Sequence, residues 1–207
     1  MKRLAIWICG VVCTAMLFCG CSSQEETAAK DEVRQGLDAL KQVNTEEAGK
    51  HLDYSKFTDA KLSIPGSDTN EELDQVLLQQ LEYDILETEV DGEKATVTTK
   101  ITNRDFGNAA QDFLPALMEL AAGYDGLQED GTTATGEATD FQTQSNQLFN
   151  DILQKEENTY SSTVDIYLEK KDGQWVMETN GMLVDAVYGG LVGSMENILK
   201  NYQDALQ

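Results

Sequence analysis

The chain is poor in the residues that carry most enzyme chemistry. It holds one histidine, two prolines and four cysteines among its 207 residues. The cysteines lie at positions 9, 13, 19 and 21, so nothing after Cys21 can form a disulfide and the domain must be held together by its core alone. A histidine-based metal site or a Ser-His-Asp relay would have to use His51, the single histidine. We interpret His51 instead as a charge near the C-terminus of a short helix.

Glycine-rich phosphate loops are also missing from the sequence. Gly189, Gly190 and Gly193 follow a predicted helix and not a strand, which excludes the Walker and dinucleotide-binding patterns. Carboxylates are plentiful, but no spacing singles out a pair for acid-base catalysis. We therefore predict no catalytic residue, no cofactor-binding residue and no metal ligand.

Basic residues are scarce: 15 Lys and Arg stand against 37 Asp and Glu, a formal net charge of −22. Such a charge repels nucleic acid, and it also repels an anionic bilayer surface, so membrane attachment would have to come from a lipid. The acidity either keeps a secreted domain soluble or serves a cation or a basic partner. The acid-rich segment 125–140 misses the ligand spacing of an EF-hand, so we interpret it as a mobile, solvated loop.

The N-terminus has the order of parts of a secretory signal. Lys2 and Arg3 precede an apolar run from Leu4 to Phe18, and Cys21 follows the small Gly20. A cysteine in this position resembles the bacterial lipobox, which implies lipidation of the Cys21 thiol. We predict a signal peptide over residues 1–20, a lipidated tether over 21–27 and attachment to the extracytoplasmic face of the cell membrane through Cys21. The alternative is an ordinary secretory signal that leaves one free thiol.

The rest of the chain, residues 28–207, predicts a single α+β domain. Apolar residues at helical spacing predict helices over 28–43, over 44–52 with a cap at Asn44 or Thr45, and over 71–81. Further helices are expected through Phe106–Leu120, with a kink or restart at Pro115, through Phe141–Leu153 and over 182–206, bent at Gly189-Gly190. The segment 54–70 is expected to be a loop with a brief strand at 61–64.

Two β-hairpins are predicted between these helices. In the first, Tyr83–Val90 turns at Asp91-Gly92 and returns through Lys94–Thr102, where Ala95, Val97, Thr99 and Ile101 alternate with polar residues. In the second, Val164–Leu168 turns at Lys171–Gly173 and returns through Trp175–Glu178. Trp175 and Met177 share one face of that strand, so we predict that both pack in the core.

With these hairpins placed, the sequence resembles Firmicutes-type lipoproteins that carry an uncharacterised domain. That resemblance implies an α+β fold in which a curved antiparallel sheet of two hairpins packs with amphipathic helices. It implies a cone of the nuclear transport factor 2-like, cystatin-like type, with a helical insertion and a C-terminal helix. It brings no catalytic residues. The stretches that carry it are Tyr83–Leu86, Asp91–Thr98, Ile101–Phe106, Val164–Val176, Leu183–Leu191 and Gly36–Lys41 before Glu46–Ala48.

Two functions from different classes are compatible with these observations. The first is a non-enzymatic, lipid-anchored domain that binds a small ligand or an envelope partner. The second is an enzyme of the isomerase or dehydratase type that uses a buried carboxylate in a cone-shaped pocket. A pocket with converging acids would favour the enzyme, whereas a cone filled by side chains would favour an interaction surface.

Overall fold

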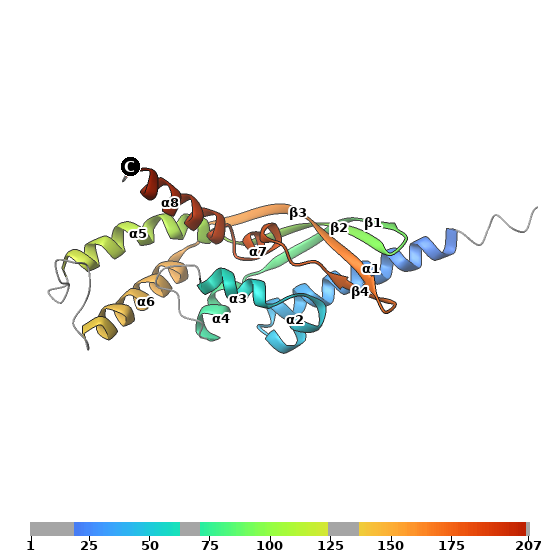
Figure 1. Ribbon diagram of the computed structural model, residues 1–207, viewed down its shortest axis with the longest axis horizontal. Coiled ribbons are helices and arrows are strands. Elements are labelled where there is room, and N and C mark those ends of the chain that lie inside the picture. The colour runs from blue at the N-terminus through green and yellow to red at the C-terminus, as the bar shows by residue number, and fades with distance from the viewer. Residues whose placement is uncertain (1–18, 63–70, 124–136, 206–207) are drawn as a thin grey trace, which may run out of the picture.

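The computed structural model describes residues 19–62, 71–123 and 137–205. Over these residues the chain forms eight helices and one open, four-stranded antiparallel sheet, which confirms the α+β class. The molecule is elongated: α1 lies at one end, the sheet in the middle, and α5, α6 and α8 form the other end (Figure 1). The helices are α1 (Cys19–Lys41), α2 (Thr45–His51), α3 (Ser55–Leu62), α4 (Glu71–Leu78), α5 (Phe106–Ala122), α6 (Glu137–Lys155), α7 (Gly181–Val187) and α8 (Leu191–Ala205). The strands are β1 (Glu82–Asp91), β2 (Lys94–Arg104), β3 (Thr159–Lys171) and β4 (Gln174–Met177).

Both predicted hairpins are present and stand next to each other in the sheet order β1-β2-β3-β4. The first turns at Gly92, which has a φ of 65°. The second turns at Asp172 and Gly173, whose φ values of 52° and 82° are those of the tight turns that match the twist of paired strands. The long connection between β2 and β3 holds α5 and α6, so the two hairpins are joined by the helical end of the molecule.

The sheet has one buried face and one wet face. Ala95, Val97, Thr99 and Ile101 of β2 are buried, as their alternation predicts. Trp175 and Met177 of β4 are buried as well, which confirms their predicted place in the core. Helices α1 and α7 pack on the buried face.

Helix α1 begins earlier in the chain than its apolar spacing predicts. It starts at Cys19, so the residues expected to form a tether lie within its first turns. Helix α2 then begins where a cap is predicted, with Asn44 Oδ1 accepting a hydrogen bond from the Glu47 backbone N–H at 3.1 Å.

The expected loop after α2 is wrong over residues 55–62, which form helix α3. The brief strand is wrong at Lys61 and Leu62, the last residues of that helix; the remainder of it, 63–64, lies outside the described residues. Phe57 and Lys61 are both buried on one side of α3. Apolar spacing does not predict this helix, because a lysine occupies the buried position that an apolar residue would mark.

The longer helices agree with their predicted positions. Helix α4 ends at Leu78, three residues before the expected end. A kink or a restart is expected at Pro115; helix α5 continues from Phe106 to Ala122 with Pro115 inside it, so it does not restart there, and a kink stays a prediction. Helix α6 starts at Glu137, so residues 137–140 are helical and do not belong to a loop; the segment 124–136 lies outside the described residues.

The C-terminal helical segment is divided at the predicted glycine pair. Gly189 and Gly190 have φ values of 54° and 76° and separate α7 from α8. A Cβ at Gly189 would stand 2.0 Å from the Arg104 carbonyl oxygen, so the end of β2 and the α7–α8 junction approach each other as only glycine permits. The Gly107 backbone N–H donates to the Gly189 carbonyl at 3.0 Å.

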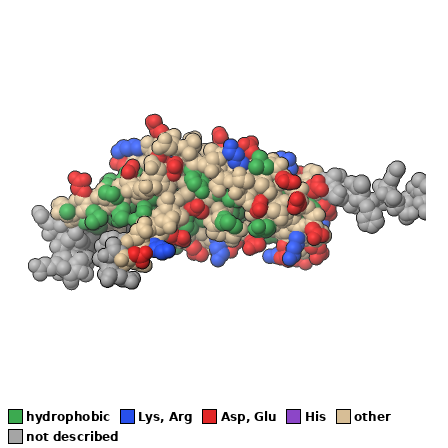
Figure 2. Space-filling view, turned by 90° about the horizontal axis from the view of Figure 1, so that it is seen from above, with side chains coloured by type: hydrophobic (Ala, Val, Ile, Leu, Met, Phe, Trp, Pro, Cys, Tyr) green, Lys and Arg blue, Asp and Glu red, His purple; other side chains and the backbone are tan. Residues whose placement is uncertain are grey.

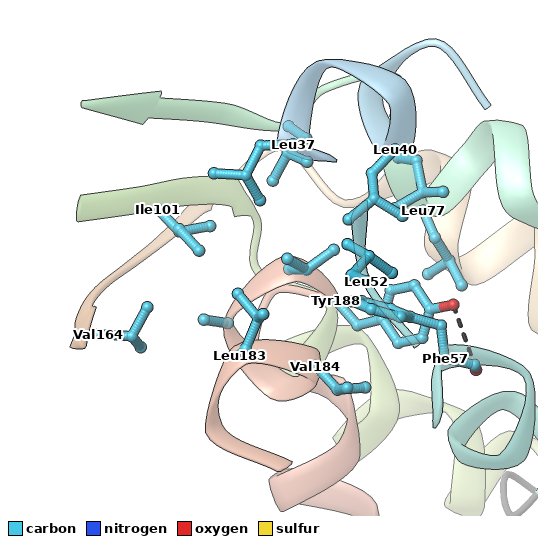
Figure 3. Packing of buried hydrophobic residues seen from close by; sticks show 14 of the residues in the cluster. Leu37, Leu40, Leu52, Phe57, Leu77, Ile101, Val164, Leu183, Val184 and Tyr188 are labelled. Atoms are coloured by element: carbon cyan, nitrogen blue, oxygen red, sulfur yellow. Dashed lines mark hydrogen bonds between the residues drawn. The ribbon is translucent and has the colours of Figure 1, made fainter. Parts of the chain in front are cut away.

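The core lies between the sheet and the helices that cover it. Leu37 and Leu40 of α1 face Leu183 and Val184 of α7 across the apolar interior (Figure 3). Tyr188 is fully buried at the edge of this cluster; its ring meets Phe57 edge-on and its hydroxyl donates to the Phe57 carbonyl at 3.3 Å. The same cluster therefore fixes α3 against the end of α7.

Within residues 19–62, 71–123 and 137–205, no helix is both long enough and apolar enough to cross a membrane.

Candidate functional site

The predicted lipidation residue lies at one extreme of the molecule. Cys21 belongs to the first turns of α1, at the end of the long axis opposite α5 and α8 (Figure 1). A few residues later, Glu25 Oε2 accepts hydrogen bonds from Lys170 Nζ at 2.7 Å and from Trp175 Nε1 at 3.2 Å. The hydrogen bond from Lys170 lowers the pKa of Glu25. The start of α1 is thus attached to the second hairpin.

His51 ends α2, as predicted, and lies in a polar contact between helices. Its Nδ1 is 2.9 Å from Glu32 Oε1 of α1, and its Nε2 is 3.6 Å from Glu47 Oε1. Among the described residues, no cluster of three or more His, Cys, Asp or Glu side chains could hold a metal ion. The contacts of His51 therefore join α1 to α2.

A buried polar cluster lies between α3 and α4. Lys61 Nζ donates to Asp74 Oδ1 at 2.5 Å, and both side chains are buried. Burial and the nearby Asp74 raise the pKa of Tyr54. Burial also raises the pKa of Tyr188. This cluster holds titratable groups, but its lysine and carboxylate neutralise each other.

A hollow of about 420 Å³ opens on the other side of α4. Its lining combines one face of α4 and the turn after it with the end of β2 and one face of α6. The residues on each helix recur at intervals of three or four, so they share a side of their helix. The lining residues are Glu72, Gln75, Val76, Gln79, Gln80, Arg104, Asn150 and Gln154.

Two polar groups in this hollow are incompletely satisfied. Arg104, the last residue of β2, donates from Nη1 to the Gln154 carbonyl at 3.1 Å. No carboxylate of the described residues lies within ion-pair distance of its guanidinium. Asn150 Oδ1 is buried and has no hydrogen-bond partner in the described part of the chain. An unpaired cation and an unpaired acceptor together make this hollow a candidate ligand site.

Asn103 holds the wall of this hollow in place. Its side-chain amide is 1% exposed and donates to the Leu77 carbonyl of α4 and the Val187 carbonyl of α7, both at 2.7 Å. Its Oδ1 accepts from the Arg104 backbone N–H at 2.8 Å. The neighbour of Arg104 thereby fixes the end of β2 against two helices.

A second hollow, of about 500 Å³, lies on the wet face of the sheet. Its charges are mixed: Lys94 lies opposite Glu169 in the strand register, and Lys171 and Glu178 also line the hollow. Since cations and anions alternate there, the charges of this hollow indicate no particular ligand.

The helical end of the molecule carries exposed apolar side chains. Met118 of α5 is 58% exposed and Leu199 of α8 is 40% exposed. Figure 2 shows hydrophobic side chains gathered at this end of the molecule. Leu114, Leu117 and Ile198 are half-buried. These side chains belong to two helices, α5 and α8, that pack against each other, and we call Leu114, Leu117, Met118, Ile198 and Leu199 together the apolar end.

No protein-family model, no curated protein and no solved structure matches the chain. The resemblance to Firmicutes-type lipoproteins and to the cone fold stays a prediction from the sequence.

Sequence reasoning singled out neither the hollow nor the apolar end. Asn103 could have been found, because it continues the alternation of Val97, Thr99 and Ile101 on the buried face of β2. Arg104 and Asn150 come together only through the packing of β2 and α6, and no local pattern marks them. Met118 belongs to a helix with more apolar residues than a single buried face requires. This excess is visible in the sequence and indicates that some apolar side chains of α5 remain exposed.

Proposed function

We propose that the chain is a lipid-anchored, extracytoplasmic protein, attached to the membrane through Cys21, that binds an envelope protein with its apolar end. The observation that carries this proposal is the opposite placement of Cys21 and the apolar end along the molecule (Figure 1). A lipid at Cys21 would leave α5 and α8 at the end away from the bilayer.

The composition of the apolar end favours a protein partner. Monomeric proteins rarely expose contiguous apolar surface without a use for it, and interfaces are built around such surface. Helix α5 contains no basic residue, and its charged residues are Asp112 and Glu119. Glu196 and Asp204 add two further acids on α8, against one lysine. A partner with an apolar face bordered by Lys and Arg fits this surface, whereas a second copy would place acid against acid.

The enzyme alternative would use Asp74, the buried carboxylate of α4, within the cone fold that the resemblance implies. Asp74 is paired with Lys61, and neither hollow described above has Asp74 in its lining. A general base needs to reach the proton that it removes, so these contacts favour binding over catalysis.

The attachment is tested by replacing Cys21 with serine in the native host. We expect Cys21→Ser to abolish fatty-acid labelling and to shift the protein out of the washed membrane fraction. Label that persists in the variant would rule out lipidation at Cys21.

The partner is tested by placing a photo-crosslinking amino acid at Met118 in the native host. The matched control is Tyr167, which is 41% exposed on the wet face of the sheet. We expect a crosslink to one envelope protein from position 118 and none from 167. Equal crosslinking from both positions, or crosslinks from 118 to a second copy alone, would contradict the proposal.

A further inference from the structure

The hollow between α4 and α6 has a lining that differs in character from the rest of this acidic surface. Five of its side chains are primary amides, and its only charged residues are Glu72 and Arg104. Each amide offers two donor hydrogens and one acceptor oxygen, which is the pattern that a peptide group complements. The volume of about 420 Å³ falls within the range of small-ligand sites. The amide side chains are Gln75, Gln79, Gln80, Asn150 and Gln154.

Arg104 is the group that would make the hollow prefer a negatively charged ligand. Acids outnumber bases by more than two to one in this chain, and Lys50, Lys61 and Lys170 each lie against a carboxylate. Arg104 has no such partner among the residues that the structure describes. Its guanidinium carries five N–H donors, and the Gln154 carbonyl is the one acceptor that it contacts there. A carboxylate matches the remaining planar pairs of donors.

Asn150 adds a requirement for a donor on the ligand. Its Oδ1 is buried and lacks a partner within the described residues, an arrangement that ordinarily costs stability. A ligand N–H would satisfy it. A group that combines a carboxylate with an N–H a few ångströms away is the C-terminal residue of a peptide.

We propose that this hollow binds the C-terminal carboxylate end of a short peptide, with Arg104 pairing with the carboxylate, Asn150 accepting from the peptide N–H, and the glutamine amides contacting the peptide groups. This site requires neither a lipid at Cys21 nor a partner at the apolar end, so a failure of either of those proposals would leave this one untouched.

The probe is N-acetyl-alanyl-alanine, titrated into the full chain in detergent and followed by ligand-observed NMR. Two comparison compounds are titrated in the same way. The first is the same dipeptide with a C-terminal amide, which lacks the carboxylate. The second is glucuronate, which has a carboxylate but no peptide N–H. We expect saturable binding of the free acid and binding of the other two compounds at least about 10-fold weaker, because a charge-assisted pair is lost in one and a buried acceptor stays unpaired in the other.

Two variants test the assigned groups. Arg104→Gln should weaken binding of the acid about 10- to 100-fold, the range for loss of a charge-assisted pair. Asn150→Leu should also weaken binding while leaving the unfolding midpoint unchanged or higher, because it removes a buried polar atom without a partner. Lys155→Gln, which removes one positive charge next to Gln154 outside the lining, is the matched control and should bind as the parent does.

Several results would overturn the proposal. The first is the absence of saturable binding of the dipeptide acid. The second is an equal affinity for the acid and for its C-terminal amide. The third is an affinity for glucuronate equal to that for the acid. Binding that is unchanged in a folded Asn150→Leu variant would contradict the role of Asn150. If Lys155→Gln lost as much affinity for the acid as Arg104→Gln, the net charge of the protein and not the Arg104 guanidinium would control binding.

Discussion

The sheet half of the molecule and its helical end use apolar residues in opposite ways. Around the sheet, Leu37 of α1, Ile101 of β2 and Leu183 of α7 are almost wholly removed from water. On the helical end, no residue of α5 after Phe113 is buried, and Met118 lies largely in solvent. Both halves are rich in apolar side chains, so composition alone does not tell them apart.

This contrast in burial indicates which apolar residues stabilise the fold. Burial from water contributes about 25 cal/mol per Å² of apolar surface, so the side chains around the sheet supply most of the free energy of folding. Side chains that remain exposed contribute little of it. Under the function proposed above, those on α5 and α8 contact another molecule instead.

The largest effect is expected at the sheet half, from Trp175. It is 6% exposed, and its indole N–H donates to Glu25 of α1. Trp175→Ala should lower the free energy of unfolding by about 3–5 kcal/mol, the usual cost of truncating a buried aromatic residue. Urea unfolding followed by circular dichroism measures this. Trp175→Phe keeps most of the packing and should lose less; a parent-like midpoint in Trp175→Ala would refute the structural role.

A somewhat smaller loss is expected where the two halves join, from Asn103. Asn103→Ala leaves the Leu77 and Val187 carbonyls without their donor, and unsatisfied buried polar groups cost about 1–3 kcal/mol. The urea midpoint should fall accordingly. Lys100→Ala, an exposed change on the same strand, serves as the control and should have little effect. Equal midpoints for the two variants would show that the Asn103 bonds do not matter.

A pH-dependent effect is expected at Glu156, between α6 and β3. Burial, at 9% exposure, opposes its charged form, but hydrogen bonds from the Asn108 side chain and the Asn158 backbone N–H outweigh it and lower the pKa below the ordinary value of 4.5. A lowered folded pKa stabilises the fold above pH 4.5, and this contribution is lost as pH falls through the folded pKa.

Glu156→Gln should therefore be less stable than the parent near neutral pH, and the gap should narrow in acid. Urea midpoints at about pH 7 and about pH 3 test this, since pH 7 lies above and pH 3 below the ordinary pKa of 4.5. Glu157→Gln, an exposed neighbour, should show no such change in its gap to the parent. If the difference in stability between the parent and Glu156→Gln grew larger in acid, the lowered pKa assigned to Glu156 in the folded state would be wrong.

The smallest effect on stability is expected at the apolar end. Met118→Ala should change the free energy of unfolding by no more than about 0.5 kcal/mol, because the side chain is largely in solvent. Met177→Ala removes the same side chain from the core of the sheet half and should cost about 2–5 kcal/mol. If Met118→Ala and Met177→Ala lowered the free energy of unfolding by similar amounts, the distinction between the apolar end and the sheet half would be wrong.

The sequence predicts the sheet half far better than the helical end and the hollow. Alternation in β2 identifies its buried face, and Asn44 with Glu47 identifies the start of α2, because both signals are local. Helix α3 could not be predicted in this way, since its buried Lys61 pairs with Asp74 of a different helix, a partner that no local pattern marks. The hollow depends on α4, β2 and α6 together, and that arrangement is set by the packing of the whole domain.

Helix α1 has a mechanical consequence for a protein held at Cys21. Its 23 residues correspond to roughly 35 Å of continuous helix, and Ala29, Val33 and Leu37 along it are buried against the domain. A disordered leash would let a domain swing through a wide volume above the bilayer. Helix α1 is part of the domain and leaves no such disordered segment after Cys21. If Cys21 carries the lipid, the domain is therefore held close to its anchor, and a partner must approach the membrane to reach it.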